Sequence, residues 1–138
     1  MSKVIISGAA GRMGRSLVRG VQESHEFTLF GALESEGNES LGLDAGELAG
    51  IGKTGVLLSP TDESLIEQAD VMIDFSSPAA SISNAEICAE FGTALVIGTT
   101  GIDSEQEDGL RKWAKKVPIF MSPNMSVGMS MLLSLIHI

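Results

Sequence analysis

The sequence is poor in the residues that mark several classes of protein. A single cysteine, Cys88, excludes an internal disulfide and fits a reducing, cytoplasmic setting, and its helical surroundings predict a small core residue. Nine basic residues against 18 acidic ones give a net charge of −9, which argues against a nucleic acid or an anionic membrane as partner. No run reaches the length of a membrane span, and the apolar stretch in MSKVIIS is too short for a signal peptide. The cysteine and the two histidines form no metal-ligand spacing.

What is present is a regular alternation of short apolar strands and helical segments. The hydrophobic content of 43% is enough for the core of one domain, or of part of one. Short, continuously apolar strands separated by helices predict an α/β fold with a doubly wound, Rossmann-like parallel sheet. The expected strands are residues 3–7, 27–33, 54–59, 71–75, 94–98 and 119–121, and the expected helices are 13–24, 61–68, 78–91 and 104–116.

Two local features refine this pattern. Residues 34–55 are acidic and rich in glycine, so we expect a long connection without a regular element. Ser104 and Glu107 have the spacing of a capping box, which predicts the start of the last helix.

The most informative motif is VIISGAAGRMG at residues 4–14, an apolar strand followed by three glycines and a helical pattern. Gly8 frees the backbone at the strand end, Gly11 lets a phosphate approach, and Gly14 lets the helix pack closely on the strand. The helix start offers unpaired N–H groups to a polyanion, which predicts a pyrophosphate site. Glu34 directly follows the second strand and lies about 20 residues beyond Gly14, where an acidic group binds ribose hydroxyls. A glycine turn without ligand and a solvated Glu34 are the alternatives.

In such sheets the ligand lies beyond the carboxyl ends of the strands. Thr99 and Thr100 offer hydroxyls near the expected nicotinamide end, and Asn124 offers an amide for a carboxamide. Ordinary turn chemistry is the alternative for these three residues. The strand-end segments are residues 8–13, 34–35, 75–77, 98–101 and 122–125.

Taken together, GAAGRMG, ALE, LGLDAGELAG, GKTGV, DFSSP, VIGTTG and PNMSVG resemble the bacterial 4-hydroxy-tetrahydrodipicolinate reductases of lysine biosynthesis (the diaminopimelate pathway), over the chain to about Leu133. The resemblance implies an NADH- or NADPH-dependent oxidoreductase. The resemblance further implies that its small-molecule substrate is the dehydrated form of 4-hydroxy-tetrahydrodipicolinate, which is reduced to tetrahydrodipicolinate, and that the full-length protein is a homotetramer. It also implies cofactor contacts at Gly8, Ala9, Ala10, Gly11, Arg12, Met13, Glu34, Ser35, Gly98, Thr99, Thr100, Ser122, Pro123, Asn124 and Met125.

Three departures from the family pattern change these expectations. Ser35 and Ser77 stand where many members carry arginine, which removes cations from the adenosine end and favours NADH over NADPH. The family's second domain, with its His-His-x-x-Lys motif, is not found in this sequence, so we expect no catalytic residue here and no turnover by this chain alone.

Residues 1–125 are expected to form the dinucleotide-binding domain. Residues 126–138 are expected to begin the connection to a missing substrate and tetramerisation domain, with the last residues out of frame.

Two other functions fit parts of the pattern. A non-catalytic NAD(P)-binding Rossmann module would share the glycine turn, but it leaves IGTTG and PNMSVG unexplained. An S-adenosylmethionine-dependent methyltransferase also uses a glycine turn and an acid after the second strand, but three glycines opening directly into a helix favour a pyrophosphate.

Overall fold

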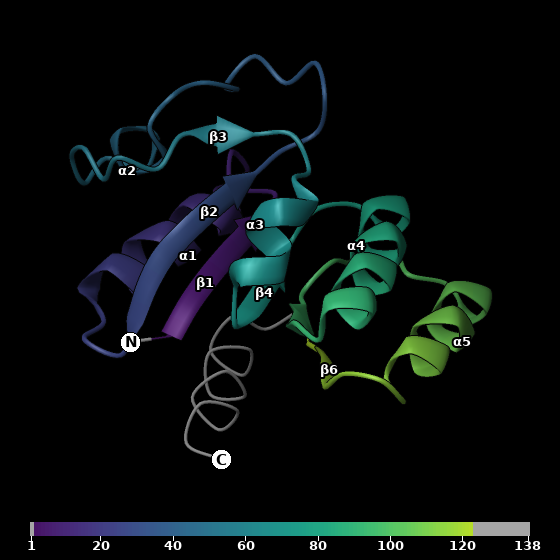
Figure 1. Cartoon of the computed structure of the whole chain (residues 1–138). Helices are drawn as coiled ribbons and strands as arrows, with labels where there is room; N and C mark the ends of the chain where they lie inside the picture. The colour runs from purple at the N-terminus through teal and green to yellow at the C-terminus, as the bar shows by residue number, and fades with distance from the viewer. Residues whose placement is uncertain (1, 123–138) are drawn as a thin grey trace.

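The computed structural model describes residues 2–122 and shows a single parallel sheet of six strands in the order β3-β2-β1-β4-β5-β6 (Figure 1). Every neighbouring pair of these strands runs parallel, and the order reverses between β1 and β4. This Rossmann-like arrangement confirms the predicted fold class. The strands are β1 Ser2–Ser7, β2 Phe27–Leu33, β3 Leu58–Ser59, β4 Val71–Asp74, β5 Ala94–Ile97 and β6 Ile119–Met121.

Helices cover both faces of the sheet, and the alternation of side chains along β1 explains why. Val4 and Ile6 point into one buried cluster, with α1 and α2, whereas Ile5 points into the other, with α3, α4 and α5. Both faces are therefore apolar, as a doubly wound sheet requires. The helices are α1 Arg12–Glu23, α2 Ala45–Leu48, α3 Glu63–Gln68, α4 Pro78–Phe91 and α5 Ser104–Trp113.

Two local predictions were wrong. The connection after β2 does contain a regular element, the short helix α2, because the Asp44 side chain caps it by accepting the N–H groups of Gly46 and Glu47. The capping box of α5 is formed by Asp103 and Gln106, one residue earlier than the predicted Ser104 and Glu107. Asp103 has the extended backbone of an N-cap, so Ser104 becomes the first helical residue.

The prediction of a core position for Cys88 is confirmed. Cys88 is fully buried in the cluster beneath α4, and burial raises the pKa of its thiol to about 12, with a smaller contribution from the charge of Asp74. Trp113 packs against the same cluster and is half-buried. Among the described residues, no helix has the length and apolar character needed to cross a bilayer.

Candidate functional site

The glycine turn between β1 and α1 has the tight geometry that its spacing predicts. Gly8 has φ +82°, and a Cβ there would lie 2.4 Å from the carbonyl oxygen of Phe75. A Cβ on Gly14 would lie 2.1 Å from the carbonyl oxygen of Gly8, because α1 crosses directly over the end of β1. The fold itself therefore requires glycine at positions 8 and 14.

Gly11 differs from these two glycines. Its φ is −73°, which any residue adopts, and a Cβ would meet only the carbonyl oxygen of Gly8 at 3.4 Å. Packing within the chain does not explain a glycine here. A ligand that approaches the backbone at this point would explain it.

The start of α1 also differs from the other helix starts. Gly11 is its N-cap and supplies no side-chain hydrogen bond. In the described part of the chain, the other helices are capped by the side chains of Asp44, Asp62, Ser77 and Asp103. The first N–H groups of α1 are therefore left open, with the positive end of the helix dipole, toward the carboxyl edge of the sheet.

Glu34 reaches from the end of β2 to this turn. One carboxylate oxygen accepts the N–H of Ala10 at 3.0 Å, and the other accepts the N–H of Ser35 at 3.0 Å. The predicted acid thus lies against the predicted phosphate turn and is half-buried.

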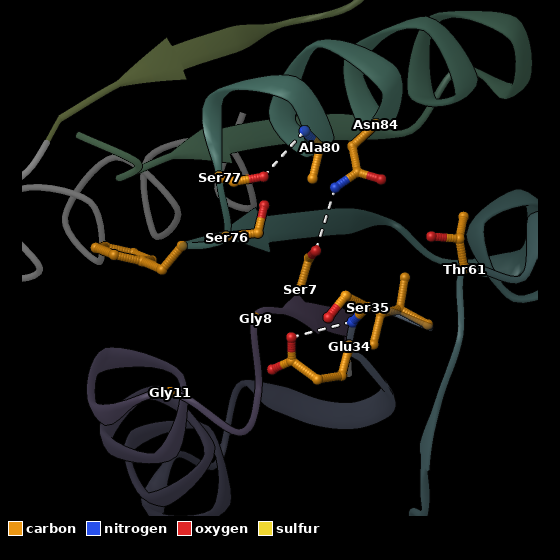
Figure 2. Close-up of a pocket in the computed structure, with 12 residues that line it drawn as sticks. Ser7, Gly8, Gly11, Glu34, Ser35, Thr61, Ser76, Ser77, Ala80 and Asn84 are labelled. Carbon is orange, nitrogen blue, oxygen red and sulfur yellow. Dashed lines mark hydrogen bonds between the residues drawn. The ribbon is translucent and has the colours of Figure 1, made fainter. Parts of the chain in front are cut away.

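Two clefts meet at the carboxyl edge of the sheet, and Gly11, Phe75 and Ser76 line both of them. The adenosine-side cleft, named for the ligand end expected there, has a volume of about 310 Å³ and is shown in Figure 2. The nicotinamide-side cleft has a volume of about 330 Å³. The first is lined by Ser7, Gly8, Gly11, Leu33, Glu34, Ser35, Thr61, Phe75, Ser76, Ser77, Ala80 and Asn84, and the second by Gly11, Arg12, Met13, Phe75, Ser76, Gly98, Thr99 and Thr100.

Most of the predicted site residues meet at these clefts. Ala9 is buried in the core under the turn, and Ala10 contributes its backbone N–H to Glu34. Ser122 is buried at the end of β6, where its N–H donates to the carbonyl oxygen of Ile97 at 2.7 Å. The remaining predicted residues, Pro123, Asn124 and Met125, lie outside the described residues.

Sequence reasoning missed part of the adenosine-side cleft. The sequence predicts a strand end at residues 75–77 and points to Ser77 at the adenosine end, but it does not single out Ser76. Asn84 lies in the second turn of α4, and its sequence position carries no signal, because only the packing of α4 brings it beside Ser7. Thr61 was predicted to begin a helix, but α3 begins at Glu63, so Thr61 lies in the loop after β3 and lines the cleft from there.

A buried polar network lies beneath both clefts and centres on Asp74, the last residue of β4. Its carboxylate is fully buried and accepts hydrogen bonds from the N–H and the hydroxyl of Ser76 and from the amide nitrogen of Asn84, the last at 3.2 Å. Its backbone carbonyl accepts the N–H of Gly98 at 2.8 Å. The hydroxyl of Ser81 bonds that of Thr99 at 2.8 Å. Asp74 therefore links the residues of the two clefts.

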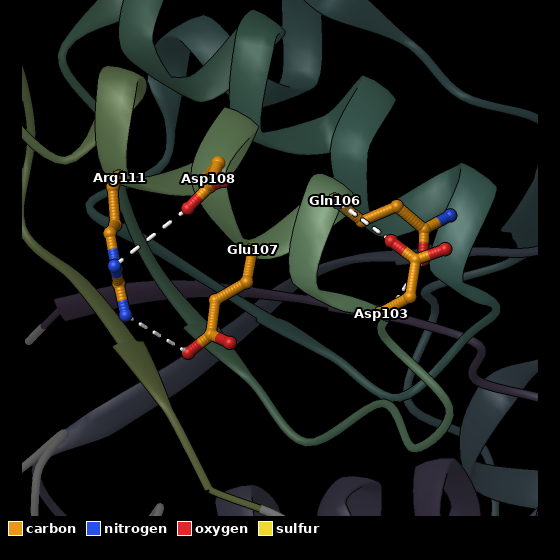
Figure 3. A network of polar contacts seen from close by, with 5 residues as sticks. All are labelled: Asp103, Gln106, Glu107, Asp108 and Arg111. Atoms are coloured by element: carbon orange, nitrogen blue, oxygen red, sulfur yellow. Dashed lines mark hydrogen bonds and ion pairs between the residues drawn. The ribbon is translucent and has the colours of Figure 1, made fainter.

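Charged groups elsewhere do not add to the site. Arg111 on α5 contacts Glu107 and Asp108, each at 3.7 Å (Figure 3). These side chains are largely exposed, and none of the three residues lines either cleft. Exposed pairs of this kind contribute little to stability. Among residues 2–122, no group of three or more His, Cys, Asp or Glu side chains is placed to hold a metal ion.

Comparison with known proteins gives consistent matches. A family profile described as "Dihydrodipicolinate reductase, N-terminus" matches residues 2–125. A 4-hydroxy-tetrahydrodipicolinate reductase of Chromohalobacter salexigens is 41% identical over 99% of this chain and 51% of its own length. One from Citrifermentans bemidjiense is 40% identical over 94% of this chain and 49% of its own length.

Among solved structures, the dipicolinate-bound dihydrodipicolinate reductase of Paenisporosarcina sp. TG-14 matches with a TM-score of 0.71 and 25% identity, over 96% of this chain and 51% of its own. The chain thus spans about half the length of the curated relatives that it matches.

Proposed function

The chain belongs to the family of dihydrodipicolinate reductase N-terminal domains, and from this we propose that it binds NADH or NADPH across the two clefts. The observation that carries the proposal is the open start of α1 beside Gly11, at the point where both clefts meet. A pyrophosphate at that point would place one nucleoside in each cleft. The bound cofactor would supply a hydride.

The described residues fit this ligand group by group. Gly11 leaves its Cβ position clear for a phosphate, and the unpaired N–H groups of α1 offer donors to it. Glu34 would exchange its bond to Ala10 for the hydroxyls of the adenosine ribose. Thr99 and Thr100 line the nicotinamide-side cleft, which supports a role in holding the nicotinamide end. The same role is proposed for residues 122–125.

The reaction of the whole protein follows as a further proposal. The curated relatives are named 4-hydroxy-tetrahydrodipicolinate reductases and are about twice as long as this chain. We infer that this chain supplies the cofactor half of an oxidoreductase of lysine biosynthesis. Reduction of a small-molecule substrate and assembly of a homotetramer are proposed for the whole protein and are not assigned to the described residues. No catalytic residue is assigned within this chain, and we expect no turnover by it alone.

We further propose that NADH is preferred over NADPH. Ser35 and Ser77 line the adenosine-side cleft together with Glu34, so no cation stands at these positions to pair with a 2′-phosphate. The carboxylate of Glu34 would repel that phosphate. A charge-assisted hydrogen bond is worth roughly 1.5–3 kcal/mol, and without one the extra phosphate adds no affinity.

The test of cofactor binding is a fluorescence titration of NADH into the wild type and into Gly11→Val. Position 11 tolerates a side chain in the fold, whereas a branched side chain would block the pyrophosphate. We expect at least an approximately tenfold loss of affinity, which is about 1.4 kcal/mol. Gly20→Ala is the matched control, because Gly20 also lies in α1 and a Cβ there would have nothing within 4 Å. Equal affinity of Gly11→Val and wild type would contradict the proposed placement.

A further inference from the structure

We propose that Asn84 is a base-specificity residue that presents a hydrogen-bond acceptor to the adenine ring, and that Asp74 sets its orientation. This inference rests on the proposed function, since it concerns the adenosine end of the dinucleotide. The geometry points to a carbonyl oxygen facing a ligand N–H group, the exocyclic amino group of adenine.

The orientation of the Asn84 amide is fixed by its neighbours. Its nitrogen lies 3.2 Å from a carboxylate oxygen of Asp74 and 3.1 Å from the hydroxyl oxygen of Ser7. A carboxylate only accepts hydrogen bonds, so the amide must turn its NH₂ group toward Asp74. The carbonyl oxygen of Asn84 is then directed away from Ser7 (Figure 2).

That carbonyl oxygen is open to the adenosine-side cleft. Asn84 lines this cleft, although the residue is only 3% exposed. No described residue donates a hydrogen bond to its oxygen. In the described part of the chain every fully buried side-chain nitrogen or oxygen has a partner, so this oxygen keeps some exposed surface, and the cleft is the opening that Asn84 lines. A ligand with an N–H donor would satisfy it.

The walls around Asn84 suit a flat heterocycle. Leu33 and Ala80 contribute apolar surface to the same cleft, and Glu34, the proposed ribose ligand, lies in the same wall as Leu33. Ligand sites commonly combine apolar walls with a few polar groups that fix orientation. Here the base attached to that ribose would lie between these walls and meet the carbonyl of Asn84.

Asp74 acts through Asn84 and is a positioning residue. In Asp74→Asn, the new amide must keep its oxygen toward the N–H of Ser76, which turns its NH₂ toward Asn84. The Asn84 amide then reverses to offer its oxygen, and Ser7 can donate its hydroxyl to the same oxygen. The cleft would now face a donor instead of an acceptor, with no change in shape.

The experiment compares NADH with reduced nicotinamide hypoxanthine dinucleotide, in which an oxygen replaces the 6-amino group. We expect the wild type to bind NADH at least about tenfold more tightly, which is about 1.4 kcal/mol. Asn84→Ala should bring the ratio of the two dissociation constants close to one. Asp74→Asn should bring it to one or below, because the reversed amide favours the oxo group. This reversal separates a role in orienting the Asn84 amide from a merely structural role, because partial unfolding weakens the binding of both dinucleotides equally.

The control is Thr93→Val. Thr93 is buried just before β5, at the edge of the sheet opposite to the clefts, and the substitution removes its 2.7 Å hydrogen bond to the carbonyl oxygen of Ile66. Its ratio should match that of the wild type. A wild-type ratio of one, or a ratio unchanged in Asp74→Asn, would overturn the inference while leaving cofactor binding intact. If the wild type binds neither dinucleotide at millimolar concentration, the proposed function fails and this inference with it.

Discussion

The chain contains two glycine-rich connections that use their backbone N–H groups in opposite ways. One is the glycine turn at residues 8–14, and the other is the glycine-rich loop at residues 42–55. In the loop, the carboxylate of Asp44 accepts N–H groups from Gly46, Glu47, Thr54 and Gly55 at 2.7–3.2 Å, so the donors are used within the chain. In the glycine turn, Gly11 caps α1 without a side chain.

This difference teaches that glycine content by itself does not mark a ligand site. Both regions contain a glycine that close packing requires: Gly14, under the carbonyl of Gly8, and Gly46, whose Cβ would lie 2.3 Å from the carbonyl oxygen of Gly52. Only the turn leaves a helix start uncapped beside an open cleft. An uncapped helix start that meets a cleft is the more informative sign of an anionic ligand.

The largest expected effect comes from filling the close contact in the glycine turn. Gly14→Ala would place a methyl group 2.1 Å from the carbonyl oxygen of Gly8, and backbone cannot move aside as a side chain can. We expect a loss of about 3 kcal/mol in the free energy of unfolding, at the upper end of the usual cost of overpacking, which is a large part of the ~5–15 kcal/mol typical of a domain. Urea denaturation followed by circular dichroism measures it.

The matched variant in the same helix is Gly20→Ala, where a new Cβ meets nothing. It should stabilise the chain by about 0.5–1 kcal/mol, because alanine is the better helix former. If the two variants unfold at the same urea concentration, α1 does not pack closely on the end of β1.

The second largest expected effect is on the stability that Asp44 provides in the glycine-rich loop. Burial alone would raise the pKa of Asp44, but the hydrogen bonds from Thr54, Gly55 and Glu47 outweigh it and hold that pKa well below its usual value of 3.8. The charged carboxylate therefore stabilises the fold above about pH 4, and this contribution is lost as the pH falls further. Asp44→Asn should lower the urea midpoint at pH 7 and flatten the acid side of the stability profile.

This variant also sharpens the comparison between the two regions. If the loop is purely structural, Asp44→Asn should leave the dissociation constant of NADH unchanged once the folded fraction is accounted for. A roughly tenfold weaker affinity, about 1.4 kcal/mol, in fully folded Asp44→Asn would show that the loop takes part in binding.

The same two regions show what sequence reasoning can reach. The glycine turn was predictable because its spacing, the preceding strand and Glu34 are all local patterns. The loop was not, because Asp44 gathers donors ten and eleven residues away, and only the folded chain brings Thr54 and Gly55 to it. These contacts also explain why the predicted strand 54–59 shortens to Leu58–Ser59: the N–H groups of residues 54 and 55 bond Asp44 instead of a neighbouring strand.

The residues of the candidate site also divide into those that the sequence could predict and those that it could not. Residues at strand ends, such as Ser35 and Thr99, could be named from the sequence because a parallel sheet brings all its carboxyl ends to one edge. Asn84 could not, since nothing local distinguishes it from the other polar residues of α4. Its role depends on Asp74 and Ser7, which lie 10 and 77 residues away in the chain.

The smallest expected effect is a change of cofactor preference beside the open turn. Ser35→Arg would add a cation to the adenosine-side cleft next to Glu34, where a 2′-phosphate is expected. The position is exposed, so solvent screens the charge. We expect NADPH binding to strengthen relative to NADH binding, so that the ratio of the NADH to the NADPH dissociation constant rises by about tenfold, or about 1.4 kcal/mol. Both constants are measured at one salt concentration.

The control is Ser83→Arg on the exposed side of α4, which makes the same charge change outside the lining of either cleft and should leave the ratio unaltered. Tighter binding of NADPH than of NADH by the wild type would refute the proposed preference, and an equal shift in both variants would mean that net charge, not position 35, sets the ratio.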